Sequence, residues 1–418
     1  MRRTRDSKTA RKTLSFQRVL RVLHQFHGRR FEKEGAAWDL LFREVIGQGI
    51  QAFEREAPVV WTTSYVFPME MIAGLGMIPV DFEIYAGLMS NANLSAQTLR
   101  AADRVSLPQD SCTVHRMALG AALLDLLPHP DILVSTTHYC DGKARTNEFM
   151  ARHYGVDYLL LDMPFEDTPE AQAYLESQLR QIFRRLCELA GQEADESILK
   201  APIRHFNEMT RHMRQVDDLR MESPSPVIPQ NGGLTYGFIT SLLYGTPYAT
   251  EVYRRLAQEF LRDRERGTIP PESFRFVWLM ASPSFQTPIF SLLEERGARI
   301  VAGEMSHCYW TELDEGAPIA SMARRMFSNT FMGPVARRAR TAVELARNYR
   351  ADALLHFGHL PCRQANGALQ VIKDHLEAEG FRLINLEADL NDPTNFPAER
   401  IKDQLLTHLD VLQSRRRV

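Results

Sequence analysis

The stretch that decides the fold covers residues 132–161 and reads ILVSTTHYCDGKARTNEFMARHYGVDYLLL. It holds a compact apolar run at 132–135 and a continuous apolar run at 156–161. Between them, a helical pattern at 146–154 ends at Gly155. Apolar runs that do not alternate with polar residues are typical of parallel strands buried on both faces. The stretch therefore predicts a strand, a helix and a second strand of a parallel sheet that helices cover on both sides.

The alternation of strand and helix continues on the N-terminal side of this stretch. Short apolar runs lie at 59–62 and 78–80, and a helical pattern at 117–127 ends before two prolines. Residues 58–164 are therefore expected to form one doubly wound α/β domain.

The same alternation returns between residues 271 and 418. Runs typical of strands occur at 274–280, 299–302, 353–356 and 382–387, and helical patterns occur at 287–296, 336–350, 368–379 and 397–412. We expect a second doubly wound sheet, so that the strand ends of two similar halves can face one another across a cleft.

Helical patterns dominate the remaining segments. Thr168 followed by Pro169 predicts the N-cap and first turn of a helix, and the Pro-rich segment 222–229 predicts a stiff linker. The expected organisation is an N-terminal helical segment at 1–57, a first α/β domain with a helical extension at 58–229, and a second α/β domain at 230–418.

The composition is that of a globular protein with two domains, with 418 residues of which 44% are hydrophobic and 24% charged. A formal net charge of -2 gives no reason to expect nucleic acid as a partner. Five cysteines are too few for a disulfide scaffold, and no N-terminal stretch is typical of a secretion signal. We therefore expect a cytoplasmic protein with free thiols. No apolar run approaches the roughly 20 residues that span a bilayer, so no membrane is expected as a partner.

Three cysteines stand where helices are expected to begin: Cys112 in SCTVHR, Cys140 in THYCDGK and Cys362 in GHLPCRQ. Residues just past the carboxyl ends of parallel strands converge, so thiols that are distant in sequence can meet there. A helix N-terminus also stabilises an anionic sulfur. A shared metal centre is one interpretation. Buried thiols without ligands are the other, because the Cys-x-x-Cys pairs of structural zinc sites are missing.

Several motifs occur in the order seen in one known family. They are YVFPMEMIAGLGMIPV at 65–80, Cys112, the CDGK site at 140–143, Cys362 followed by Arg363 and Gln364, and NLEADL at 385–390. With them, the chain resembles the 2-hydroxyacyl-CoA dehydratase and benzoyl-CoA reductase family over nearly its full length beyond the N-terminal helices. The resemblance implies two flavodoxin-like, Rossmann-like domains with a 4Fe-4S cluster between them. Its expected ligands in this chain are Cys112, Cys140 and Cys362.

The resemblance also implies a radical enzyme, either a lyase or an oxidoreductase. The iron that lacks a cysteine would pass single electrons to an acyl-CoA thioester, which becomes a ketyl radical anion, or to a conjugated ring. A cleft closed by two domains would exclude water from this chemistry. The partners implied are a paralogous subunit or a second copy of the chain, an ATP-hydrolysing iron-sulfur activator and the acyl-CoA substrate.

Three other side chains are candidate catalytic residues. Glu70 follows Pro68, which could open a helix, and is either a proton acceptor or an ordinary acid of a first helical turn. His138 and His359 lie close in sequence to candidate ligands. Each either donates a hydrogen bond to cluster sulfur, acts at the iron that lacks a cysteine, or is a structural histidine.

The other two cysteines have simpler interpretations. Cys308 follows a predicted strand and is either a fourth ligand or a buried bystander, and Cys187 lies in a helical apolar pattern that places it in the core. Gly74 and Gly76 lack the spacing of a dinucleotide fingerprint, which argues against a nicotinamide cofactor.

Two other classes of function stay open at this stage. The chain could be a non-catalytic paralogue, an electron-relay or structural subunit that keeps its cluster without binding substrate. It could also be a cofactor-free, doubly wound binding protein with buried cysteines.

Overall fold

The computed structural model describes residues 7–105, 108–226, 234–308 and 311–415, so the end of the expected linker, residues 227–229, lies outside the described residues. The chain forms two compact units, neither of which is contiguous in sequence. The first unit contains Met1–His212, Ile239–Leu256 and Thr311–Ser328, and the second contains Met213–Phe238, Ala257–Trp310 and Asn329–Val418. The boundaries expected at residues 57 and 229 stay predictions.

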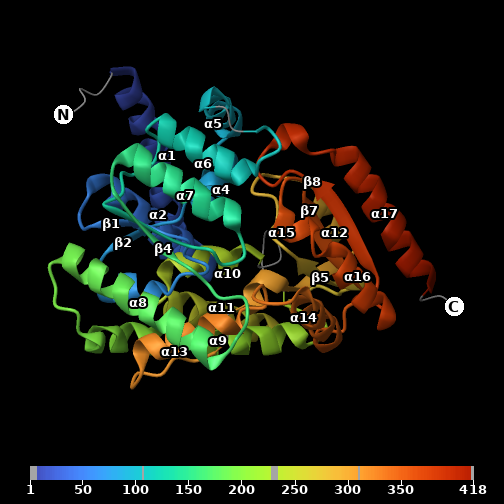
Figure 1. The fold of residues 1–418 in the computed structure, drawn as a ribbon. Coiled ribbons are helices and arrows are strands. Elements are labelled where there is room, and N and C mark those ends of the chain that lie inside the picture. The colour runs from blue at the N-terminus through green and yellow to red at the C-terminus, as the bar shows by residue number, and fades with distance from the viewer. Residues whose placement is uncertain (1–6, 106–107, 227–233, 309–310, 416–418) are drawn as a thin grey trace. The chain divides into compact units, whose positions relative to one another are not determined.

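The first unit contains a four-stranded parallel sheet in the order β2-β1-β3-β4. Strands β1, β2 and β4 are labelled in Figure 1. Its strands are β1 (Val59–Trp61), β2 (Ile78–Val80), β3 (Ile132–Thr136) and β4 (Asp157–Leu161). Apart from β4, whose residues are partly exposed, the strands are buried along their whole length. This burial explains why they are continuous apolar runs in the sequence.

Among the described residues, eight helices precede, connect or follow these strands. They are α1 (Ser7–Glu34), α2 (Ala37–Glu54), α3 (Met69–Gly74), α4 (Phe82–Asn91), α5 (Ser95–Ala102), α6 (Thr113–Leu123), α7 (Asp141–Tyr154) and α8 (Pro169–Ala190). Helix α7 packs against β3 and β4, and α2 packs against β2. The predicted cap of α8 is confirmed, because the Thr168 hydroxyl accepts a hydrogen bond from the amide of Ala171 at 3.2 Å.

Three further helices carry the chain from one unit to the other. They are α9 (Lys200–Met221), α10 (Leu234–Thr240) and α11 (Pro247–Arg266). Helix α13 (Pro318–Ser328) then lies in the first unit, although it is distant in sequence from the first sheet.

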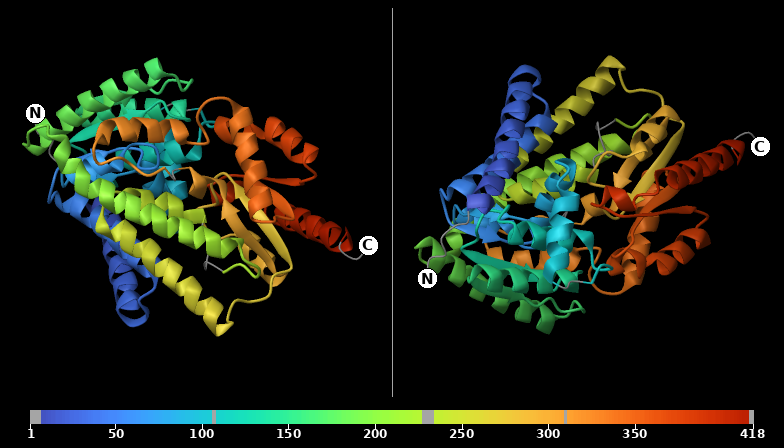
Figure 2. Two further views of the ribbon diagram at one scale, coloured as in Figure 1. Left: turned by 90° about the horizontal axis from the view of Figure 1, so that it is seen from below. Right: turned by 90° about the horizontal axis from the view of Figure 1, so that it is seen from above.

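The second unit repeats the topology of the first, with a parallel sheet in the order β6-β5-β7-β8. Its strands are β5 (Phe274–Leu279), β6 (Ala298–Gly303), β7 (Ala353–His359) and β8 (Leu383–Ala388). Its helices are α12 (Pro288–Glu295), α14 (Val335–Asn348), α15 (Arg363–Asn366), α16 (Leu369–Ala378) and α17 (Ala398–Arg415). Most of these elements carry the orange and red colours of Figure 2.

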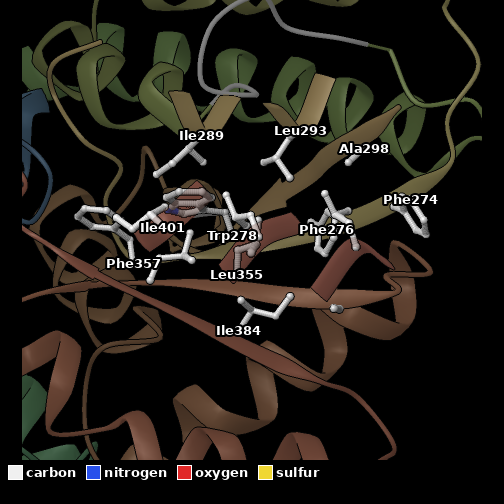
Figure 3. Close-up of a cluster of buried hydrophobic side chains, with 14 of the residues drawn as sticks. Phe274, Phe276, Trp278, Ile289, Leu293, Ala298, Leu355, Phe357, Ile384 and Ile401 are labelled. Atoms are coloured by element: carbon white, nitrogen blue, oxygen red, sulfur yellow. The ribbon is translucent and has the colours of Figure 1, made fainter. Parts of the chain in front are cut away.

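Helices cover both faces of the second sheet. Side chains alternate along β5, so Phe276 and Trp278 face α12 and α17, whereas Val277 and Leu279 face α14 and α16. Figure 3 shows the first of these layers, in which Trp278 and Leu355 lie among the apolar side chains of α12 and neighbouring strands. A parallel sheet with a core on each face is doubly wound, as the sequence predicted.

All eight predicted strands are confirmed, and the α/β fold with two flavodoxin-like sheets and helical segments is confirmed with them. Two helices begin earlier than their apolar patterns indicated: α6 starts at Thr113 and α7 at Asp141, each directly after a cysteine. Within the described residues, no helix combines the length and the apolar character needed to cross a membrane.

Candidate functional site

Two candidate cysteines occupy equivalent places in the two sheets. In each sheet the chain crosses to one side of the first strand and then to the other, so a topological switch point lies between β1 and β3 and another between β5 and β7. Cys140 follows β3, and Cys362 follows β7. Each thiol therefore lies at the carboxyl edge of its sheet, where ligands bind in open α/β folds.

In the first unit, Cys112 and Cys140 are half-buried N-cap residues of the neighbouring helices α6 and α7. The Sγ atom of Cys140 lies 3.9 Å from Nε2 of His115, which belongs to the first turn of α6. A Cβ atom at position 142 would lie only 3.0 Å from Cε1 of His115. Gly142 therefore lets the imidazole approach the start of α7.

Lys143 places a buried cation beside the same helix start. Its side chain is fully buried, and its Nζ lies 2.9 Å from a carboxylate oxygen of Glu83 and 5.1 Å from the centre of the Tyr139 ring. Burial works to lower the pKa of Lys143, but the negative charges of Glu83, Asp81 and Cys140 outweigh it, and the pKa is raised. The ammonium group therefore stays charged inside the first unit.

Asp81 caps helix α4 next to this cation. Its carboxylate accepts hydrogen bonds from the Glu83 amide at 2.9 Å and from the Ser64 amide and hydroxyl at 2.7 and 2.8 Å. Burial, followed by the negative charge of Glu83, raises the pKa of Asp81 to about 6, although Lys143 opposes the shift.

His138 lies between β3 and Cys140 and is fully buried. Within the described part of the chain, neither of its ring nitrogens has a hydrogen-bond partner. Burial, with the charge of Lys143 as a second cause, lowers the pKa of His138 to about 3, so the ring is neutral. Buried polar atoms without a protein partner are places where water or a ligand binds.

In the second unit, Cys362 caps the short helix α15, and its sulfur accepts a hydrogen bond from the amide of Ala365 at 3.4 Å. His359 ends β7, and its Nδ1 accepts from the Leu390 amide at 3.1 Å. The neutral ring therefore carries its proton on Nε2. Burial lowers the pKa of His359, and Asp389 opposes the shift.

A buried ion pair supports the helix that Cys362 caps. Arg338 of α14 donates to both carboxylate oxygens of Glu304, at 2.5 and 2.9 Å, and to the carbonyl of Gln364 at 3.0 Å. Cys308 follows Glu304 by four residues and is buried, and its Sγ lies 3.6 Å from the Glu304 carbonyl oxygen.

Cys187 is buried in α8, which confirms the prediction that this thiol belongs to the core.

Glu70 lies in the first turn of α3, which Pro68 precedes as the N-cap, as expected. The carboxylate is fully buried, and its two oxygens accept hydrogen bonds from Arg325 at 2.5 and 2.8 Å. The Arg325 guanidinium also lies 4.4 Å from the centre of the Phe206 ring. Both oxygens of the Glu70 carboxylate are therefore engaged by the Arg325 guanidinium.

A cavity of about 350 Å³ also lies in the first unit. It is lined by residues of α2 and α3, by the amino end of β2 and by the segment around Tyr244. Because the amino end of β2 lines it, the cavity lies at the edge of the sheet opposite the one that carries Cys140. None of the predicted site residues lines it.

No disulfide links any of the five cysteines, all of which lie in the described part of the chain. Thiolates at helix N-termini are suitable ligands for an iron-sulfur group, so the donor chemistry of Cys112, Cys140 and Cys362 fits the expected cluster. Among the residues that the structure describes, no group of three or more His, Cys, Asp or Glu side chains is arranged to hold a metal ion. Shared ligation by the three cysteines stays a prediction.

The sequence did not point to His115, Asp81, Glu83, Arg325 or Arg338. Two local signals were available: His115 follows Cys112 by one helical turn, and Asp81 is a preferred N-cap residue two positions before Glu83. Glu83, Arg325 and Arg338 pair with groups that are distant in sequence.

Comparisons with known proteins agree with this architecture. Residues 64–412 match the family described as 2-hydroxyglutaryl-CoA dehydratase, D-component, a range that contains Glu70 and the three candidate cysteines. The chain is 22% identical to lactoyl-CoA dehydratase subunit alpha of Anaerotignum propionicum, over 54% of this chain and 60% of that protein. It is 22% identical to the (R)-phenyllactyl-CoA dehydratase beta subunit of Clostridium sporogenes, over 77% of this chain and 84% of that protein. One of the subunits of the benzoyl-CoA reductase of Thauera aromatica is 21% identical, over 75% of this chain and 79% of that protein. The match to the first of these relatives thus spans less than two thirds of its length.

Proposed function

Because the chain belongs to the 2-hydroxyglutaryl-CoA dehydratase D-component family, we propose that it is the 4Fe-4S subunit of an ATP-activated radical 2-hydroxyacyl-CoA dehydratase or benzoyl-CoA-type reductase. Its substrate in this proposal is an acyl-CoA thioester. One structural observation carries the proposal above all: Cys140 and Cys362 follow the third strand of two sheets with the same topology, each as a helix cap.

In this proposal the thiolates of Cys112, Cys140 and Cys362 would hold the cluster. A cluster of this kind supplies single electrons at low potential when it is bound. The chain's own contribution is to present sulfur at helix N-termini, where backbone amides favour negative charge.

Neighbouring side chains have roles that follow from their protonation and burial. The neutral ring of His138 is suited to donate a hydrogen bond to sulfur or to a substrate oxygen. His359, which ends β7, is the second proposed donor. Glu70 is the proposed proton acceptor, and Arg325 holds its carboxylate in place.

The proposal requires partners and a reducing compartment. Relatives of this chain are named as alpha or beta subunits of dehydratases, which supports a paralogous subunit as the partner, with a second copy of this chain as the alternative. Electrons would arrive from a separate ATP-hydrolysing iron-sulfur activator, and cysteines that form no disulfide suit the cytoplasm.

Iron analysis of single-cysteine variants tests the ligand assignment. We expect Cys112→Ser, Cys140→Ser and Cys362→Ser, purified without oxygen, to lose most of their iron and acid-labile sulfide, because each loses one thiolate ligand. Cys187→Ser is the matched control, since this thiol lies in the core of α8, and it should keep the iron content of the parent protein. Equal iron in all four variants would refute the assignment.

A second function, an electron-relay or structural subunit without its own substrate, is favoured by the contacts of Glu70. Its carboxylate is already occupied by Arg325, as expected for a residue with a structural role. Acyl-CoA binding by the isolated chain separates the two functions, because a relay subunit should not bind the thioester. Loss of activity in Glu70→Gln with unchanged iron and stability would support the catalytic role.

A further inference from the structure

Lys143 lies in a position that is unfavourable for a lysine in two respects. It stands at the third position of α7, where the helix dipole disfavours a cation, and it is fully buried, where an ammonium group is costly to desolvate. A residue that violates local preferences in this way commonly serves a site. Any function of Lys143 must therefore involve an anion close to the start of α7.

The position of Lys143 directs it toward Cys140. A side chain at the third position of a helix reaches back to the N-cap, which is the geometry of a capping box, and the N-cap of α7 is Cys140. The contact of Nζ with the Tyr139 ring places the ammonium on the same side of the helix start. Glu83, from α4, supplies a compensating carboxylate 2.9 Å from Nζ.

We propose that Lys143 is a positioning residue of the iron-sulfur site: its buried ammonium orients the sulfur of Cys140 by charge and makes the bound group easier to reduce. The inference rests on the proposed function. Reduction adds one negative charge to the site, and a fixed cation in a buried environment stabilises that charge more than water-screened surface cations do. Glu83 pairs with this ammonium at 2.9 Å, and its negative charge acts with the opposite sign.

Opposite changes in reduction potential distinguish this role from a purely structural ion pair. The full chain, reconstituted with iron and sulfide without oxygen, is titrated with reductant and followed by its visible and electron paramagnetic resonance spectra. We expect Lys143→Met to make reduction at least about tenfold less favourable, which is about 59 mV for one electron, and Glu83→Gln to make it more favourable. Lys373→Met, which removes an exposed lysine of the second unit, should leave the potential unchanged.

Two additional variants keep the test decisive if Lys143→Met folds poorly. Lys143→Arg keeps the charge and should keep the potential near that of the parent protein. Lys143→Met combined with Glu83→Gln removes both charges, which a buried pair commonly tolerates, and should give a potential between those of the single variants. Loss of iron in a folded Lys143→Met that Lys143→Arg restores would also support the inference.

The inference and the proposed function fail in different ways. If the parent protein takes up no iron, the proposed function is wrong. If the parent and the variants hold the same iron but show the same potential, or shift it in the same direction, Lys143 has no electrostatic role and the proposed function stands.

Discussion

At the scale of single residues, Asp81 combines a helix cap with an unusual protonation state. The side chain is fully buried and caps α4, and its three hydrogen-bond donors stabilise the charged form. Burial and the neighbouring Glu83 nevertheless raise the pKa of Asp81 from 3.8 to about 6. The folded protein therefore binds this proton more tightly than the unfolded chain does.

This shift gives a prediction for stability against pH. Because Asp81 has the higher pKa in the folded state, its stabilising contribution is complete below pH 4 and is lost as the pH rises through about 6. The loss is on the order of 3 kcal/mol. Asp81→Asn stays neutral, so urea unfolding at several pH values should show no such loss in this variant.

The difference in stability between the parent protein and Asp81→Asn isolates the contribution of Asp81 to the pH dependence. His138, whose pKa is lowered, acts with the opposite sign, since it destabilises the folded state as the pH falls below 6.5. It contributes equally to both proteins and cancels in the difference. The exposed Asp403→Asn should keep the pH dependence of the parent, and a pH-dependent loss in Asp81→Asn equal to the parent's would contradict the prediction.

The candidate site was predictable only where its signals are local. A turn former next to Cys140 and the proline before Cys362 mark helix starts, and both cysteines do cap helices. The charges around Lys143 were not predictable, because Glu83 meets it only when α4 and α7 approach one another. From its place after Pro68, Glu70 was predicted to be either a proton acceptor or an ordinary acid of a first helical turn, and its partner Arg325 lies far along the chain.

At the scale of elements, strands were predicted better than helix starts. Strands of a doubly wound sheet are buried on both faces, and so appear as continuous apolar runs such as 353–356 of β7. Helix α6 begins at Thr113, four residues before the start that its apolar pattern indicated. The pattern missed the first turn because His115 and Arg116 are polar, although both are buried and contact Cys140 and Asp103.

The buried sheet core of the second unit predicts a large effect of cavity formation. Leu355 is fully buried in β7 between Trp278, Ile384 and helix α17 (Figure 3). We expect Leu355→Ala to lower the free energy of unfolding by about 2–5 kcal/mol, because the tightly packed layer cannot collapse around the missing methyl groups. Denaturant unfolding measures the change. Leu360→Ala removes a half-exposed leucine just beyond β7 and should cost far less, and equal losses in the two variants would argue against the packing described.

At the scale of the whole molecule, the first unit depends on segments from distant parts of the chain. Ile239–Leu256 and Thr311–Ser328 belong to it, although they follow the Pro-rich linker in sequence. Two buried polar contacts join these segments to the first sheet region: the Ser64 hydroxyl lies 2.8 Å from that of Ser241, and Glu70 pairs with Arg325. The order of strands and helices along the sequence does not indicate that segments beyond the linker belong to the first unit.

Division of the chain at residue 229 tests whether the predicted domain boundary separates independent folding units. A fragment 1–229 lacks Arg325, so Glu70 would be a buried charge without its partner, which costs about 3–5 kcal/mol. We therefore expect fragment 1–229 to lack a cooperative unfolding transition and near-ultraviolet circular dichroism when expressed alone, and to gain both when co-expressed with fragment 230–418. Glu70→Met in the isolated fragment removes the unpaired charge and should recover part of the stability. If fragment 1–229 alone unfolds at the denaturant midpoint of the full chain, the segments Ile239–Leu256 and Thr311–Ser328 are dispensable for the first unit. The boundary at residue 229 is then supported.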